Sequence, residues 1–289
     1  MTSIFRVMPV IGAIALAVAA LVVGAAHATV QAIGSNGTAS TERLPDLDQE
    51  APSYLDVKVV ASASGRSYRL GFRSAVRNIG AGPLIVEGSR ADTSMPLMRV
   101  DQLIERAGEP AAVVPDVGQM RYVVSPDHRH WHYLQFDRYA LQRYELRRAS
   151  GNEAVVADQK TGFCLGDRYR AVKGVPPAMA PQPAFTGRCG LGDPRRLRMR
   201  EGISVGWGDD YKAFLEGQDL PLDGVPNGRY LLVHRVNADG HLRESSYANN
   251  AASVLFDLNW RGGQPYLLVL AVCPDSDRCT TERPGASPS

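Results

Sequence analysis

Three histidines stand at every second position between residues 128 and 132, and imidazoles in such a row can bind a metal ion. His128, His130 and His132 are half of the six histidines of the chain. The apolar residues 122–124 precede them and Tyr133 and Leu134 follow, a context typical of a β-strand. Because strand side chains alternate between two faces, the three imidazoles are expected to share one face and to converge on copper or zinc. A His-rich solvated strand face is the structural alternative.

The N-terminal residues indicate export. Arg6 precedes an apolar run at residues 7–26, and small residues around His27 provide a plausible cleavage point. We predict a signal peptide at residues 1–28, with an uncleaved anchor as the competing interpretation because the run is almost long enough to span a membrane. The rest of the chain is then secreted, extracellular or periplasmic, without a stable membrane partner after cleavage. Residues 29–43, rich in Ser, Thr, Gly and Ala, are expected to form a flexible leader.

Composition limits the remaining possibilities. The 289-residue chain leaves about 260 residues after the signal peptide, enough for one large or two small domains. The formal net charge is +2 with both signs interspersed, so no nucleic-acid partner is expected. The number of cysteines is even, and disulfides are expected in an exported protein. Among the three possible connectivities, the local one pairs Cys164 with Cys189 and Cys273 with Cys279.

The hydrophobic pattern after the leader predicts a mainly β fold. Apolar and polar residues alternate in four stretches, with turn residues between them: 55–60, 68–76, 228–236 and 252–258. We therefore predict an antiparallel β-sandwich with long irregular loops and little helix.

Other segments are less regular. Residues 99–109 are the one helical candidate, and residues 138–147 read as a strand for which a helix is an open alternative. Residues 171–188 contain four prolines and predict a long irregular loop. Residues 280–289 are expected to be a disordered tail.

Five segments in order along the chain resemble the lysyl oxidase catalytic domain. They are Leu44-Pro45-Asp46-Leu47, the histidine strand, and residues 160–165, 202–206 and 244–250. The resemblance is collinear over nearly the whole mature chain. It implies that residues 44–279 form a lysyl oxidase-like catalytic domain, of a divergent, bacterial type.

The resemblance implies a copper-dependent amine oxidase with a self-derived lysine tyrosylquinone. His128, His130 and His132 match the family's copper ligands, and Lys160 and Tyr211 match the lysine and tyrosine of the quinone. Such an enzyme converts primary amines, including peptidyl lysine of protein substrates, to aldehydes, uses oxygen, and releases ammonia and hydrogen peroxide. Without the resemblance, Lys160 would be a surface lysine and Tyr211 a loop tyrosine.

One departure from the family concerns the catalytic base. Vertebrate members carry a histidine several residues beyond the third ligand, and here the comparable position falls near Arg138. The neighbouring Asp137 is the candidate that we predict in its place. Asp209 and Asp210 could attract a cationic amine, although acidic residues in a Gly-rich loop usually face solvent.

The resemblance also implies a calcium site. Its ligands would be oxygen atoms, which calcium prefers, from Asp46, the carbonyl of Leu47, Glu244, Asn249 and Asn250. Ser246 replaces an aspartate of the family pattern and removes a charge. The alternative is that the two asparagines only form a turn.

Two rival functions remain open at this stage. One is a non-catalytic extracellular β-sandwich module that binds zinc or copper through its histidines. The other is a zinc hydrolase in which three histidines hold the metal and a bound water. Lys160 and Tyr211 discriminate between these functions and the amine oxidase, because neither rival requires them.

Overall fold

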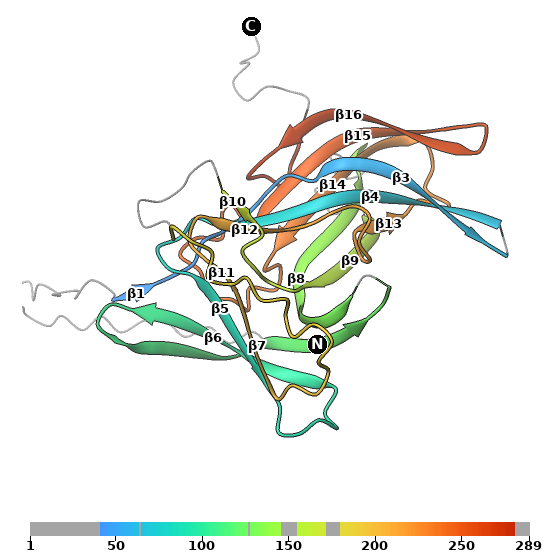
Figure 1. Cartoon of the computed structure of the whole chain (residues 1–289). Helices are drawn as coiled ribbons and strands as arrows, with labels where there is room; N and C mark the ends of the chain where they lie inside the picture. Colours follow the sequence, from blue (N-terminus) through green and yellow to red (C-terminus); the bar gives the residue numbers. More distant parts are fainter. Residues whose placement is uncertain (1–40, 64, 127, 146–154, 172–179, 281–289) are drawn as a thin grey trace, which may run out of the picture. The chain divides into compact units, whose positions relative to one another are not determined.

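The computed structural model describes residues 41–280 except residues 64, 127, 146–154 and 172–179 (Figure 1). The predicted signal peptide, most of the predicted leader, part of the loop at 171–188 and most of the predicted tail lie outside the described residues. The end of the expected leader belongs to the folded domain, because β1 (Glu42–Arg43) pairs with β6 (Leu97–Arg106). No helix in the described part of the chain has the length and apolar character needed to cross a membrane.

Ten antiparallel strands form the larger sheet. Its main path runs β11-β5-β6-β7-β8-β14-β15-β16, with β1 beside β6 and β9 beside β8. Besides β1 and β6, the strands are β5 (Leu84–Ser89), β7 (Glu109–Val124), β8 (Arg129–Arg143), β9 (Val155–Phe163), β11 (Arg198–Ile203), β14 (Gly228–Val236), β15 (Ala251–Arg261) and β16 (Gln264–Cys273).

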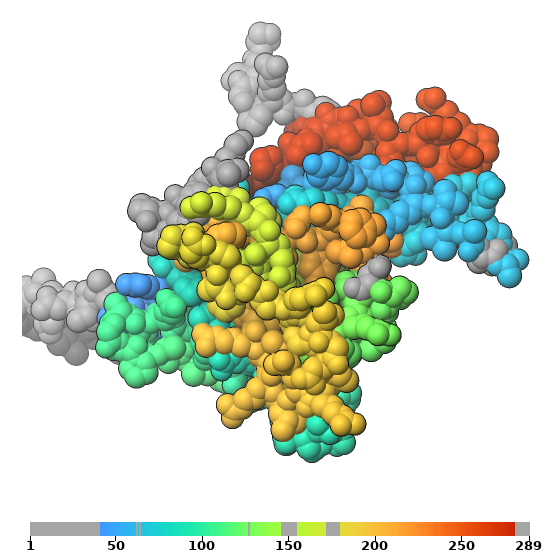
Figure 2. Space-filling model, in the orientation of Figure 1, coloured from blue at the N-terminus to red at the C-terminus, as the bar shows by residue number. Residues whose placement is uncertain are grey.

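Six antiparallel strands form the smaller sheet, in which β4 is the hub. The path runs β10-β12-β4-β13, and β2 and β3 also pair with β4. The strands are β2 (Leu47–Gln49), β3 (Ser53–Ser62), β4 (Gly65–Asn78), β10 (Tyr169–Arg170), β12 (Trp207–Tyr211) and β13 (Asp219–Pro221). On the surface, β16 in red and β3 in blue lie side by side (Figures 1 and 2).

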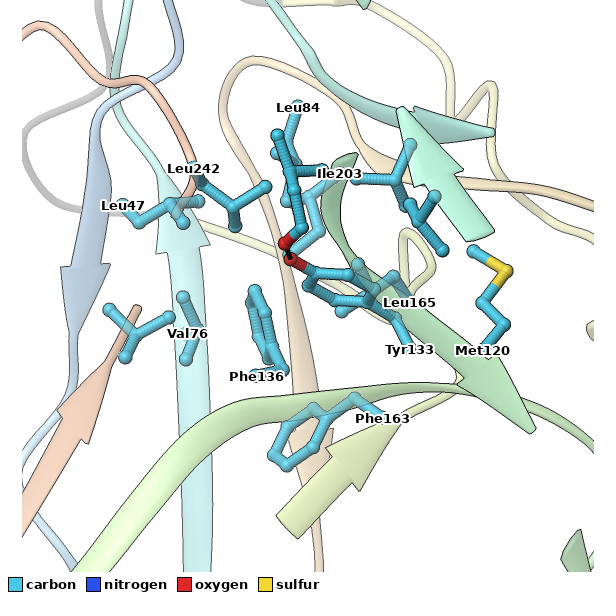
Figure 3. Packing of buried hydrophobic residues seen from close by; sticks show 14 of the residues in the cluster. Leu47, Val76, Leu84, Met120, Tyr133, Phe136, Phe163, Leu165, Ile203 and Leu242 are labelled. Carbon is cyan, nitrogen blue, oxygen red and sulfur yellow. Dashed lines mark hydrogen bonds between the residues drawn. The ribbon is translucent and has the colours of Figure 1, made fainter. Parts of the chain in front are cut away.

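The two sheets pack through a shared apolar core. Phe136 of β8 and Phe163 of β9 belong to the same buried cluster as Val76 of β4 and Tyr211 of β12. Figure 3 shows Phe136, Phe163 and Val76 within this cluster. The prediction of a mainly antiparallel β fold is confirmed, and the four alternating stretches lie in β3, β4, β14 and β15.

The helical candidate at residues 99–109 is wrong. Most of it lies in β6, where Val100 and Ile104 are fully buried while Arg99 is exposed. This alternation has the period of a strand, and Gly108, with a positive φ of 74°, turns the chain into β7. For residues 138–147, the strand prediction holds as far as Arg143, where β8 ends.

A bulge in β8 separates the histidines from the rest of that strand. Gln135 has a φ of 58°, and the pairing of β8 with β9 shifts register between Tyr133 and Asp137. A bulge adds a residue to one strand and re-aims the side chains that follow. The faces predicted by simple alternation therefore apply to residues 128–132 but not beyond residue 135.

Both predicted disulfides are present, and they lead to a test. Cys164–Cys189 closes a separation of 25 residues and Cys273–Cys279 one of six. Each disulfide lowers the entropy of the unfolded chain, more so for a longer loop. Replacing Cys164 and Cys189 by serine should therefore lower the free energy of unfolding by about 3.5 kcal/mol, and replacing Cys273 and Cys279 should lower it by about 2 kcal/mol. Urea unfolding of the two double variants measures both losses. Equal losses, or a larger one for the shorter loop, would contradict this ranking.

Candidate functional site

The three histidines converge, as the alternation predicts. Their ligand nitrogens lie within 4.8 Å of one another, and Nε2 of His130 is 2.8 Å from Nε2 of His132. His128 and His132 are buried, at 4% and 5% exposure, and His130 is half-buried. Trp131 points to the opposite face and is fully buried in the core. Three nitrogen donors that leave coordination positions open suit copper or zinc.

Burial keeps the imidazoles of His130 and His132 neutral. It lowers the pKa of His132 to about 2 and that of His130 to about 4, and the neighbouring imidazoles add to both shifts. At neutral pH these rings therefore carry free lone pairs, the form that binds a metal.

The histidine strand is fixed at both edges. β7 pairs with one edge, with Val123 opposite His130. On the other edge the amide of Trp131 donates to the carbonyl of Cys189 at 2.8 Å. Since Cys189 is held by its disulfide, the loop that supports the histidines is tied covalently to Cys164.

A cavity of about 340 Å³ lies beside the histidines, lined by His128, His132, Lys160 and Glu216 among others. Glu216 places a carboxylate oxygen 3.8 Å from Nδ1 of His128. At this distance the carboxylate is a charged neighbour of His128 and not a hydrogen-bond partner. No motif in the sequence pointed to Glu216.

Tyr211 lies behind the histidines in β12 and is 6% exposed. Its ring stacks on Phe163 with 4.1 Å between centroids, and it is 6.1 Å from the rings of both His128 and His132. The Tyr211 hydroxyl accepts a 2.7 Å hydrogen bond from the amide of Cys164. Burial, reinforced by the nearby Asp209, raises the pKa of this phenol well above its ordinary value, so the side chain is protonated.

Lys160 borders the histidine cavity but is engaged elsewhere. Its ammonium nitrogen lies 2.8 Å from both carboxylate oxygens of Asp239, and the side chain is 38% exposed. Within the described part of the chain no hydrogen bond joins Lys160 to Tyr211. The structure thus brings Tyr211 to the histidines and Lys160 to the rim of their cavity, and leaves the two apart.

Asp137, the predicted catalytic base, lies in the interior and does not line the histidine cavity. It is fully buried and accepts a 2.7 Å hydrogen bond from the Ser74 hydroxyl. The same hydroxyl lies 3.1 Å from Nδ1 of His234, which is also fully buried. Because the bulge at Gln135 re-aims the chain, Asp137 joins β8 to β4 inside the core. A base must reach the substrate, so a catalytic role of Asp137 stays a prediction.

Two further buried carboxyls, Glu201 and Asp209, lie near Tyr211. Three consecutive amides donate to three acidic groups: Cys164 to Tyr211, Leu165 to Glu201 at 2.9 Å, and Gly166 to Asp209 at 3.1 Å. Asp209 is fully buried, contrary to the expectation that it faces solvent. Glu201 was not predicted, because nothing in the spacing of β11 distinguishes it from a surface carboxylate.

The predicted calcium residues also come together. Asn249 donates to Asp46 at 2.8 Å, and the buried Glu244 accepts from Asn250 at 2.8 Å and from the Leu47 amide at 2.7 Å. The side-chain oxygens of Asn249 and Asn250 have no hydrogen-bond partner among the described residues. Burial raises the pKa of Glu244 to about 7. Unpartnered amide oxygens beside two carboxyls are a donor set that fits calcium.

Comparisons with known proteins give matches to the same family that the sequence motifs resemble. The sequence model of the family described as lysyl oxidase matches residues 86–264. Protein-lysine 6-oxidase of Gallus gallus is 28% identical over 148 residues, 50% of this chain and 30% of that protein. The Sus scrofa protein-lysine 6-oxidase is 27% identical over 148 residues, 50% of each chain. Lysyl oxidase homolog 3A of Danio rerio is 28% identical over 160 residues, 54% of this chain and 18% of that protein. The matched region thus spans half or less of each relative.

Proposed function

The chain belongs to the lysyl oxidase family, and we propose on this basis that it is a secreted, copper-dependent amine oxidase. We further propose that His128, His130 and His132 hold the copper ion, and that Lys160 and Tyr211 form a lysine tyrosylquinone. The observation that supports this best is the convergence of three imidazoles in front of a buried tyrosine.

A bound copper ion and the quinone would together supply the oxidation of a primary amine by molecular oxygen. The chain's own residues have more limited tasks. The three imidazoles would hold the metal, and the Glu216 carboxylate lies 3.8 Å from Nδ1 of His128. The Cys164 amide fixes the oxygen of Tyr211, while Phe163 stacks on its ring and limits contact with water.

The substrates are proposed to be primary amines, including lysine side chains of proteins. Two of the relatives are named for action on protein lysine. In this proposal the signal peptide delivers the chain to an oxidising compartment. The two disulfides are compatible with such a compartment.

The test is expression with copper under oxygen, followed by detection of a quinone. A redox-cycling stain and a coloured phenylhydrazine adduct are expected, together with hydrogen peroxide from an added primary amine. Copper-loaded protein without stain, adduct or peroxide would contradict the proposal. If the copper-loaded protein forms no quinone but the zinc-loaded protein hydrolyses a substrate, the rival function as a zinc hydrolase would be favoured.

We also propose that the cluster of Asp46, Leu47, Glu244, Asn249 and Asn250 binds calcium and stabilises the fold. A cation that binds only the folded state adds about 3 kcal/mol at a free concentration 100-fold above Kd. We therefore expect calcium to raise the unfolding temperature and EGTA to reverse the increase.

The Glu244→Gln variant should lose this calcium effect, whereas Glu42→Gln, which alters a carboxylate that pairs with Arg106, should keep it. Since the Glu244 pKa lies near 7, protonation competes with the cation, and the calcium effect should weaken as the pH falls below about 7. An unfolding temperature that calcium leaves unchanged at pH 8 would exclude the site.

A further inference from the structure

The residue between two of the proposed metal ligands is held by a loop and not by a neighbouring strand. Trp131 follows His130 and precedes His132, and its side chain is fully buried on the opposite face of β8. Its amide donates to the carbonyl of Cys189 at 2.8 Å, and its indole Nε1 donates to the carbonyl of Asp193 at 3.1 Å. Both acceptors belong to residues 189–197, a segment of turns that we call the support loop.

The support loop is anchored at both ends. At its start, the disulfide joins Cys189 to Cys164. At its end, it lies against the turn between β5 and β6, where the amide of Arg90 donates to the carbonyl of Leu197 at 3.0 Å. Figures 1 and 2 show the support loop in gold and this turn in teal. The position of the loop on Trp131 therefore depends on residues that are distant in sequence from the histidines.

The Arg90 side chain connects the support loop directly to Trp131. Its Nε donates to the carbonyl of Arg196 at 2.8 Å, and its terminal nitrogens donate to the carbonyls of Pro194 and Met95. Its guanidinium carbon also lies 4.7 Å from the centroid of the Trp131 ring, a distance typical of a cation–π contact. A planar guanidinium can make all these contacts together, whereas the donors of a lysine lie on a single nitrogen.

These contacts bear on metal binding through the separation of the imidazoles. Nε2 of His130 lies 2.8 Å from Nε2 of His132, and a tight metal site needs its ligands held in place before the ion binds. Without the Arg90 contacts, the support loop could move relative to Trp131, and the two rings would no longer be held at a fixed separation. A metal ion would then have to order its own ligands, and this entropy cost lowers the affinity.

We propose that Arg90 is a positioning residue of the histidine site. It holds the support loop on Trp131, and Trp131 in turn fixes the separation of His130 and His132. The binding of a metal by these histidines rests on the proposed function. Because Arg90 acts through Trp131, its role is to position the ligands and not to bind the ion.

The Arg90→Lys variant tests the first step of this proposal without any metal. Lysine keeps the positive charge but cannot replace the three hydrogen bonds of the guanidinium. The chain has three tryptophans, Trp131, Trp207 and Trp260, and each indole N–H donates to a backbone carbonyl. Hydrogen exchange of the three indole groups is measured by NMR on the full chain. We expect exchange at Trp131 to be at least about tenfold faster in the variant, as for the loss of hydrogen bonds to a charged group, and exchange at Trp207 and Trp260 to be unchanged.

Zinc binding to the copper-free full chain tests the second step. Zinc has no redox chemistry, so its affinity, measured by competition with a chromogenic chelator, is independent of quinone formation. Arg90→Lys should bind zinc about tenfold more weakly than the wild type, a loss typical of residues that support metal ligands. Arg261→Lys is the matched control, because the Arg261 guanidinium lies 5.6 Å from the centroid of the Tyr266 ring at the β15–β16 hairpin. This variant should bind zinc like the wild type.

Three results for Arg90→Lys would overturn the proposal: unchanged exchange at Trp131, equal acceleration at all three indoles, or unchanged zinc affinity. Equal acceleration would indicate only a general loss of stability. A wild type that binds no zinc would contradict both this role of Arg90 and the metal site of the proposed function. A protein that gives the expected exchange and zinc results but forms no quinone with copper would contradict the proposed function alone.

Discussion

Replacing Tyr211 by phenylalanine is expected to abolish quinone formation and amine oxidation entirely, while copper still binds. The change removes one oxygen from a ring that stacks on Phe163 and leaves the three imidazoles untouched. Without that oxygen the ring cannot become a quinone. The redox-cycling stain, the phenylhydrazine adduct and peroxide release should all be lost, while the copper content per chain is unchanged.

Tyr133→Phe is the matched control for this experiment. Tyr133 is also buried in the same cluster, and its hydroxyl donates to the carbonyl of Val117 at 2.7 Å (Figure 3). Removing that hydroxyl should cost about 1 kcal/mol of stability and leave the quinone in place. A stain that survives in Tyr211→Phe would contradict the assignment of Tyr211, whether or not Tyr133→Phe keeps its stain.

The second large effect is a change in the pH dependence of stability in Asp137→Asn. Burial raises the pKa of Asp137 to about 7, whereas an unfolded aspartate titrates near 3.9. As the pH rises from about 4 to about 7, the unfolded chain releases a proton that the folded chain retains. The wild type therefore loses stability over this window, by about 4 kcal/mol for a shift of about three units.

Asparagine has no carboxyl to ionise and can still accept the hydrogen bond from Ser74. The variant should not show the pH-dependent loss of the wild type. The difference in free energy of unfolding, variant minus wild type, should therefore increase by about 4 kcal/mol as the pH rises from about 4 to about 8. Urea unfolding at several pH values measures this difference, and the other titrating groups cancel between the two proteins.

The Asp158→Asn variant should change the free energy of unfolding in the opposite direction, towards lower stability. The Arg138 guanidinium holds the pKa of Asp158 below its ordinary value, so this carboxylate stabilises the fold above about pH 4. Both side chains are 35% exposed, and the loss should be below about 1 kcal/mol. A pH profile of Asp137→Asn parallel to that of the wild type would show that Asp137 is not buried as described.

The sequence was most informative where apolar and polar residues alternate with the period of a β-strand. Alternation placed His128, His130 and His132 on one face, and it located four strands correctly. At residues 99–109 the same alternation was present, with Val100 and Ile104 as buried positions, and the helical interpretation overlooked it. The disulfide pairs followed from proximity along the chain and the expected compartment.

Features that depend on contacts distant in sequence could not be predicted. Asp137 looked like a neighbour of the histidines, but a bulge at Gln135 turned it into the core. Glu201 looked like a surface residue of a charged segment, and only the packing of β11 against residues 164–166 buried it. Asp239, which pairs with Lys160, is 79 residues away along the chain. Spacing alone does not reveal which strands pair or where a bulge interrupts them.

Peptide mapping by mass spectrometry tests the central claim most directly. Protein matured with copper and oxygen is reduced, alkylated and digested, and peptides containing Lys160 and Tyr211 are sought. We expect one cross-linked species that joins the two residues, and we expect it to be absent from Lys160→Arg, from Tyr211→Phe and from protein kept without copper. Recovery of both residues in separate, unmodified peptides from fully copper-loaded, oxygen-exposed protein would contradict the proposal that they form the cofactor.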